Sequence, residues 1–292
     1  MALERYLDPK NDLAFKRIFG SEKNQDILIH FLNDIFARGS NPIEHVTFIK
    51  TQLDPEIAAQ RSSLVDIMCE AQSGERFIVE MQVTKEPGFE KRAQYYASKA
   101  YIEQRKKDAL YKDLKEVTFL AVANFVMFPD KKAYLSHHHL LDIKTGERNL
   151  KDFSFSFIEL PKFKKNADQL ETVIDKWIYF FAHAEQTTPR ELNQIIGSDY
   201  IIQRAYEELD RYGWTEEELR SYDNSEMHHI AQMTQMIGAR EEGLAEGKKL
   251  GKAEGKTETR FQIARNLLAL DLDHVAVSKA TGLSLEEIAR LQ

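Results

Sequence analysis

The spacing of hydrophobic positions changes along this chain, and the change predicts which segments are helical and which are extended. Apolar residues recur at three- and four-residue steps over residues 24–36, which predicts a helix. An earlier helix is predicted where Asn11 or Asp12 caps the run LAFKRIF and Gly20 ends it. Residues 117–128 are apolar almost throughout, as expected for a strand buried on both faces.

The most regular pattern lies between these segments, where two apolar runs at residues 64–71 and 77–83 flank Gln72-Ser73-Gly74. A three-residue loop that ends in glycine is typical of a hairpin built from a type I turn and a left-handed residue. Further strands are predicted at 45–53, 136–141 and 153–160, and helices at 89–110 and through 166–236. Strands interspersed with helices predict an α/β fold with a mixed sheet and flanking helices.

The C-terminal part changes character, because Gly243, Gly247, Gly251 and Gly255 recur every four residues in a charged, low-complexity run. Each glycine costs a helix about 1 kcal/mol relative to alanine, so at best a marginal helix is expected. We therefore predict a main domain at 1–236, a charged glycine-repeat connector at 237–259, and a helix-turn-helix-like tail at 260–292.

Composition narrows the class of protein. The 292 residues include 40 basic and 47 acidic side chains, a formal net charge of −7, which argues against global attraction to nucleic acid. The single cysteine excludes an intramolecular disulfide and a cysteine-rich zinc module. No run of about 18 apolar residues and no apolar leader occurs, so we expect a cytoplasmic protein without a membrane partner.

The predicted hairpin places acidic side chains together. With Ala71 opposite Glu75, the register puts Asp66 opposite Glu80, and opposed Cβ atoms lie about 4.5–5.5 Å apart. Gln82 shares this face, since alternate residues of a strand point the same way. The neighbouring positions are apolar, so the two carboxylates would repel each other at high cost unless something compensates them.

A divalent cation is the simplest compensation for such a pair. Mg²⁺ is commonly held by one or two carboxylates together with waters and substrate phosphate oxygens. The alternative is that Asp66 and Glu80 line an exposed sheet edge without a role. The spacing favours a metal site over this alternative.

The helix after the hairpin carries basic residues on one face, because Arg92, Lys99 and Lys106 are seven residues apart. Interleaved tyrosines suit contacts with phosphate and sugar. The alternative is a solvated helix whose tyrosines pack into the core. We take Arg92 and Lys99 as candidate contacts to a nucleic-acid backbone.

Several segments together resemble one known family. The opening DPKNDLAFKRIFG, the hairpin LVDIMCEA…FIVEMQ, the helix RAQYYASKAY and the later FIELPKF are similar to the recombination-promoting nucleases, also called the PD-(D/E)XK nuclease family transposases. The resemblance covers roughly residues 5–240. It implies a restriction-endonuclease-like core that cleaves DNA with Mg²⁺, for which Mn²⁺ can substitute, and a link to DNA recombination or mobile elements.

The resemblance also implies roles for individual residues. Asp66 corresponds to the first metal-binding acid and Glu80 to the acid of the (D/E)XK element. Asp12 matches an acidic position in the family's N-terminal helix and is expected to complete the site. Gln82 stands where many relatives in the wider superfamily have lysine, so it can position water or phosphate by hydrogen bonds but supplies no charge.

Other functions stay open at this point. The protein could keep the fold as a catalytically weak DNA-binding or interaction protein, or it could act on RNA. In the tail, Glu286 and Glu287 would approach phosphates at the start of the last helix. We therefore favour an interaction or homo-oligomerisation element in the C-terminal helices over a DNA-reading one.

Overall fold

The computed structural model describes residues 5–49, 65–105, 110–197 and 199–291. The chain divides into two compact units, Met1–Met227 and His228–Gln292. Helix α8 (Glu216–Leu268) has its first residues in the first unit and the remainder in the second. Within the described ranges, no helix is both long enough and apolar enough to cross a membrane.

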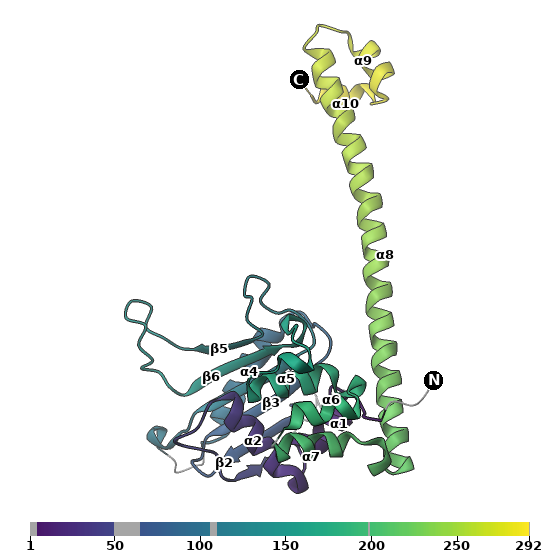
Figure 1. The fold of residues 1–292 in the computed structure, drawn as a ribbon. Helices are drawn as coiled ribbons and strands as arrows, with labels where there is room; N and C mark the ends of the chain where they lie inside the picture. Colours follow the sequence, from purple (N-terminus) through teal and green to yellow (C-terminus); the bar gives the residue numbers. More distant parts are fainter. Residues whose placement is uncertain (1–4, 50–64, 106–109, 198, 292) are drawn as a thin grey trace. The chain divides into compact units, whose positions relative to one another are not determined.

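The first unit is a six-stranded sheet with helices on both faces (Figure 1). Its strands are β1 (Val46–Phe48), β2 (Ile67–Ala71), β3 (Arg76–Gln82), β4 (Val117–Ala123), β5 (Leu135–His139) and β6 (Phe153–Glu159). Among its described residues, the α-helices besides the start of α8 are α1 (Asp12–Phe19), α2 (Gln25–Ile35), α4 (Phe89–Ile102), α5 (Val173–His183), α6 (Pro189–Ile196) and α7 (Tyr200–Leu209). Short 3-10 turns are η1 (Glu22–Asn24), η2 (Tyr111–Asp113), η3 (Leu160–Lys162), η4 (Ala167–Gln169), η5 (Ala184–Gln186) and η6 (Arg211–Gly213).

The sheet is mixed, in the order β1-β2-β3-β4-β6-β5. Strands β3, β4 and β6 run parallel to one another, while β1 pairs antiparallel with β2, β2 with β3, and β5 with β6. Every residue of β4 is buried, as its continuous apolar run predicts for a central strand covered on both faces. The expected α/β architecture is therefore confirmed.

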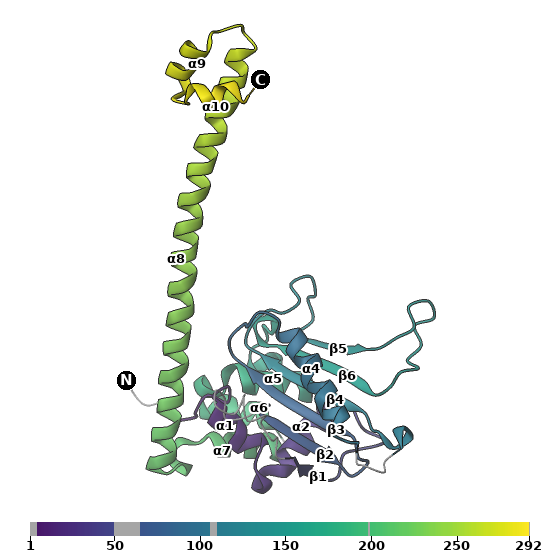
Figure 2. The ribbon, with the colours of Figure 1, turned by 180° about the vertical axis from the view of Figure 1, so that it is seen from behind.

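Helices cover the two faces unequally (Figure 2). Helices α1, α2, α5 and α7 pack on one face, where they form the larger core with side chains such as Val79 and Leu120. In the described part of the chain, α4 is the helix that covers the other face, through Phe89, Ala93 and Ala97 at four-residue spacing. The alternate residues of β3, Glu80 and Gln82 among them, therefore face α4.

The β2–β3 hairpin forms with the predicted turn and register. Ala71 N–H donates to Glu75 O at 2.8 Å and Gly74 N–H to Ala71 O at 2.9 Å. Gly74 has φ = +86°, the left-handed conformation that the turn requires and that glycine adopts without steric cost. Ile67 pairs with Val79, which is the register that places Asp66 across from Glu80.

Helix α4 and strand β4 both end well before the residues that the sequence predicts. Helix α4 stops at Ile102 rather than at 110, because the Gln104 side chain hydrogen-bonds both backbone polar groups of Lys115 and fixes a chain reversal. Lys106 lies outside the described residues. Strand β4 stops at Ala123 rather than at 128, because the following segment turns to donate its backbone N–H groups to the buried carboxylate of Glu159.

The second unit contains the remainder of α8, α9 (His274–Thr281) and α10 (Leu285–Ala289) around a small apolar core. Ser284 caps α10 by accepting from Glu287 N–H, and the Glu287 side chain accepts from Ser284 N–H in return. Residues 237–259 lie inside α8 as a continuous helix, where the glycine repeat predicts only a marginal one.

Candidate active site

Asp66 and Glu80 meet at the end of the hairpin. Asp66 immediately precedes β2, and Glu80 lies near the carboxyl end of β3. Glu80 is buried, and 18% of the Asp66 side chain is exposed. Glu80 donates a hydrogen bond to Asp66, which also accepts Met81 N–H at 2.8 Å. The two acids therefore lie close enough to share a proton, in a largely apolar surrounding.

This arrangement shifts the protonation of both acids. Burial raises the pKa of Asp66 to about 6, against the opposing effect of the Met81 N–H. Burial and the negative charge of Asp66 raise the pKa of Glu80 well above its ordinary value. A carboxyl pair of this kind holds one proton at a pH where isolated carboxyls have none, and a bound cation could replace that proton.

A lysine from helix α1, which the sequence pattern does not single out, lies next to Asp66. Lys16 Nζ is 2.7 Å from Asp12 Oδ1 and 3.8 Å from Asp66 Oδ1. Asp12 is half exposed on α1, whose N-cap is Asn11. The four-residue spacing of Asp12 and Lys16 predicts their own pair, whereas the approach to Asp66 depends on how α1 packs against the sheet.

Gln82 and Arg92 contact each other on the α4 face. Arg92 Nη2 donates to Gln82 Oε1 at 2.5 Å, and Gln82 Nε2 donates to Thr84 O at 2.9 Å. Arg92 also forms an ion pair with Glu86. The predicted backbone-contact residue is thus held beside the acids rather than extended into solvent.

The structure therefore brings together Asp66, Glu80, Gln82 and Arg92, with Asp12 adjoining them through Lys16. Lys99 does not join this cluster. It lies on α4 seven residues beyond Arg92, about 10 Å along the helix axis, and is half-buried.

The carboxylate oxygens of Asp66 and Glu80 fit a hard divalent cation that few protein ligands hold. In the part of the chain that the structure describes, no group of three or more His, Cys, Asp or Glu side chains is arranged to hold a metal. Two buried carboxyls that share a proton are nevertheless the ligands that Mg²⁺ accepts when waters and phosphate oxygens complete its shell. Asp66 and Glu80 would hold it, at the carboxyl end of a strand in the parallel part of the sheet, where α/β folds commonly bind ligands.

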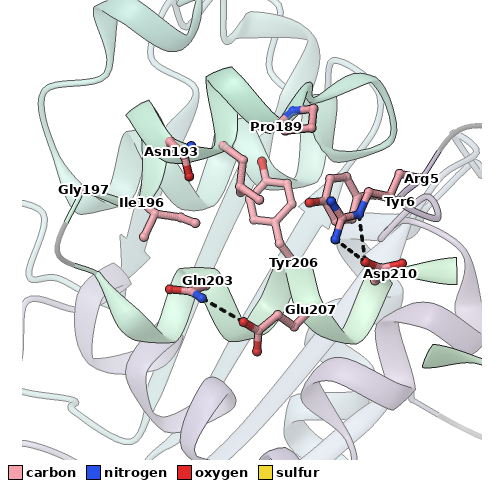
Figure 3. A pocket seen from close by; sticks show the side chains of 11 residues that line it. Arg5, Tyr6, Pro189, Asn193, Ile196, Gly197, Gln203, Tyr206, Glu207 and Asp210 are labelled. Atoms are coloured by element: carbon pink, nitrogen blue, oxygen red, sulfur yellow. Dashed lines mark hydrogen bonds and ion pairs between the residues drawn. The ribbon is translucent and has the colours of Figure 1, made fainter. Parts of the chain in front are cut away.

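A separate pocket of about 330 Å³ lies between α6 and α7 (Figure 3). Tyr206 lines it, and Arg5 pairs with Asp210 at 2.8 Å at one end. It includes none of the predicted site residues, so it does not contribute to the acid cluster.

Comparisons with known proteins give two matches, one to the main domain and one to the C-terminal tail. The model of the PD-(D/E)XK nuclease family transposase matches residues 9–236. The model of the Rpn/YhgA-like nuclease family C-terminal HTH domain matches residues 257–292. No curated protein and no solved structure matches the chain. Since the first match spans well over half of the sequence, the chain belongs to the PD-(D/E)XK nuclease family transposases.

Proposed function

We propose that this protein is a divalent-metal-dependent endonuclease that hydrolyses phosphodiester bonds of DNA, in the cytoplasm, with a role in recombination or mobile elements. Its membership in a nuclease family supports phosphodiester chemistry. The observation that carries the proposal is the buried carboxyl pair of Asp66 and Glu80, which shares a proton and is suited to a cation. Structural roles alone do not account for two acids placed at this cost.

Within this proposal, Asp66 and Glu80 bind Mg²⁺ and Asp12 supplies a third carboxylate nearby. The bound metal would make a coordinated water more acidic and neutralise charge on the phosphate. Arg92 and Lys99 contact the DNA backbone, and the approximately 10 Å between them along α4 suits contacts to different phosphates.

A plasmid-nicking assay with Mg²⁺ or Mn²⁺ tests the proposal. Asp66→Ala and Glu80→Ala should each reduce the rate of cleavage by at least about 100-fold, because each removes a ligand of the cation. Glu70→Ala is the matched control. Glu70 lies four residues further along β2 on the same face, is 42% exposed and pairs with Arg76 at 3.1 Å, so its loss should leave cleavage within about threefold.

Three outcomes would overturn the proposal or part of it. Undiminished cleavage by both alanine variants would show that the site is elsewhere. DNA binding without cleavage under either metal would favour a catalytically inactive DNA-binding protein. Cleavage of RNA in preference to DNA of the same sequence would correct the substrate class.

For the second unit we propose self-association through α8. Ile230, Ile237 and Leu244 are seven residues apart and each is more than half exposed, as in the seam of a coiled coil. Light scattering of the full chain should give a mass above that of one chain, and Ile237→Glu should reduce it to that of a monomer. A monomeric wild type at micromolar concentration would refute this proposal.

A further inference from the structure

Gln82 makes the contacts of a residue that holds another side chain. Both ends of its amide are occupied, since Nε2 donates to Thr84 O and Oε1 accepts from Arg92. The residue is 8% exposed. To bind water or phosphate in the place of a lysine, Gln82 would have to give up one of these bonds. Its contacts therefore favour a role in orienting Arg92.

Arg92 is correspondingly fixed. Besides Gln82, its guanidinium pairs with Glu86, and its Cζ lies 5.0 Å from the centre of the Phe89 ring. Nε is buried and makes no hydrogen bond with the described residues. Burial raises the pKa of Glu80, and the positive charge of Arg92 opposes that rise, which places the guanidinium within electrostatic reach of the acid.

We propose that Arg92 supplies, at the reacting phosphate, the positive charge that a lysine at position 82 supplies in (D/E)XK sites, and that Gln82 is the positioning residue that holds it there. This inference rests on the proposed nuclease function. It changes the role of Arg92 from a contact along the DNA backbone to a catalytic residue, and that of Gln82 from a ligand of water to an anchor.

The chemistry requires such a charge. In hydrolysis a water oxygen bonds to phosphorus, the bond from phosphorus to the leaving oxygen breaks, and one proton of the water passes to the leaving oxygen. Charge on the non-bridging phosphate oxygens changes during this step, and a guanidinium stabilises it with a permanent charge and planar N–H donors. A guanidinium held in place before the reaction needs little reorganisation when the charge develops.

The test moves the positive charge from Arg92 on α4 to position 82 on β3. Arg92→Ala should reduce cleavage by about 100-fold or more. Gln82→Ala should reduce it by about 10-fold, because Glu86 and Phe89 still hold the guanidinium. The double variant Arg92→Ala/Gln82→Lys should regain at least tenfold over Arg92→Ala, since a lysine on β3 restores the charge beside Glu80. Arg220→Ala is the control, because Arg220 is 81% exposed on α8 and should leave cleavage unchanged.

Binding gives a readout that does not depend on turnover. With a labelled duplex and Ca²⁺ in place of Mg²⁺, Arg92→Ala should lower the slope of log Kd against log salt by about 0.9, the loss of one phosphate contact. The double variant should restore the slope, and Arg220→Ala should not alter it. Circular dichroism melting of each variant checks that the fold is kept.

The outcomes separate this inference from the proposed function. If Asp66→Ala abolishes cleavage while Arg92→Ala stays within threefold of wild type, the nuclease proposal stands and the inference is wrong. The inference is also wrong if the double variant is no more active than Arg92→Ala. A wild type that binds DNA but never cuts it overturns the proposed function and this inference with it.

Discussion

Two buried acidic sites in the first unit have opposite surroundings. Asp175 in α5 is fully buried, and it accepts hydrogen bonds from Tyr134 Oη at 2.9 Å, Lys165 Nζ at 2.8 Å, and the backbone N–H groups of Glu171 and Thr172 at 3.1 and 3.0 Å. Burial alone would raise the pKa of Asp175, but these donors outweigh it and lower the pKa to about 2. This carboxylate is satisfied without any ligand.

The Asp66–Glu80 pair is not satisfied in this way. Among the described residues, Lys16 forms the ion pair with Asp66, at 3.8 Å and shared with Asp12, and the pKa values of both acids are raised. The difference teaches that burial of an acid does not by itself indicate function. A buried acid stabilises the fold when protein donors hydrogen-bond to its carboxylate. A buried acid without enough protein donors is suited to bind an external cation.

The largest expected effect on stability concerns Asp175. Asp175→Ala should lower the free energy of unfolding by about 3 kcal/mol, because it leaves Lys165 and Tyr134 without their common partner. Asp66→Ala, measured without divalent metal, should change it by less than about 1 kcal/mol. Urea denaturation at 25 °C measures both, and a similar loss in the two variants would remove the distinction.

Mg²⁺ should stabilise the folded protein through the Asp66–Glu80 pair and not through Asp175. Mg²⁺ at ten times its Kd should raise the free energy of unfolding by about 1.4 kcal/mol. The increase should persist in Asp175→Ala and disappear in Glu80→Ala. Thermal unfolding with and without EDTA measures it, and an equal increase in Glu80→Ala would show that the metal binds elsewhere.

Neutralising Glu80 should help the metal-free fold. At pH 8, Glu80→Gln should raise the free energy of unfolding, because the amide keeps a donor to Asp66 without a second buried charge. The same change at Glu159 should be destabilising, since that buried carboxylate pairs with Lys162 at 2.7 Å. Destabilisation by Glu80→Gln would show that the buried Glu80 carboxyl does not weaken the metal-free fold.

The smallest effects should appear in the dependence of stability on pH, where Asp66 and Asp175 should act in opposite directions. The folded pKa of Asp66 is raised to about 6, so metal-free stability should fall as pH rises from about 4 through 6. The folded pKa of Asp175 is about 2, so its contribution should be lost as pH falls from about 4 towards 2. Urea midpoints across pH should lose the first dependence in Asp66→Asn and the second in Asp175→Ala.

Much of the candidate site was predictable, because it depends on local register. The loop length and Gly74 define the hairpin turn, and the turn places Asp66 across from Glu80. The end of α4 was not predictable, since Gln104 and Lys115 meet only when the chain returns. Nor was the contact of Arg92 with Gln82, which needs α4 docked on the sheet.

By itself, the sequence determined the α/β class, the hairpin and the acid pair on one face, because strand alternation and turn chemistry act over a few residues. The family resemblance rested on the same local segments. Only the tertiary structure decided which cations approach the acids. Lys16 comes from α1 and Arg92 from α4, and the packing of separate elements sets where long side chains end.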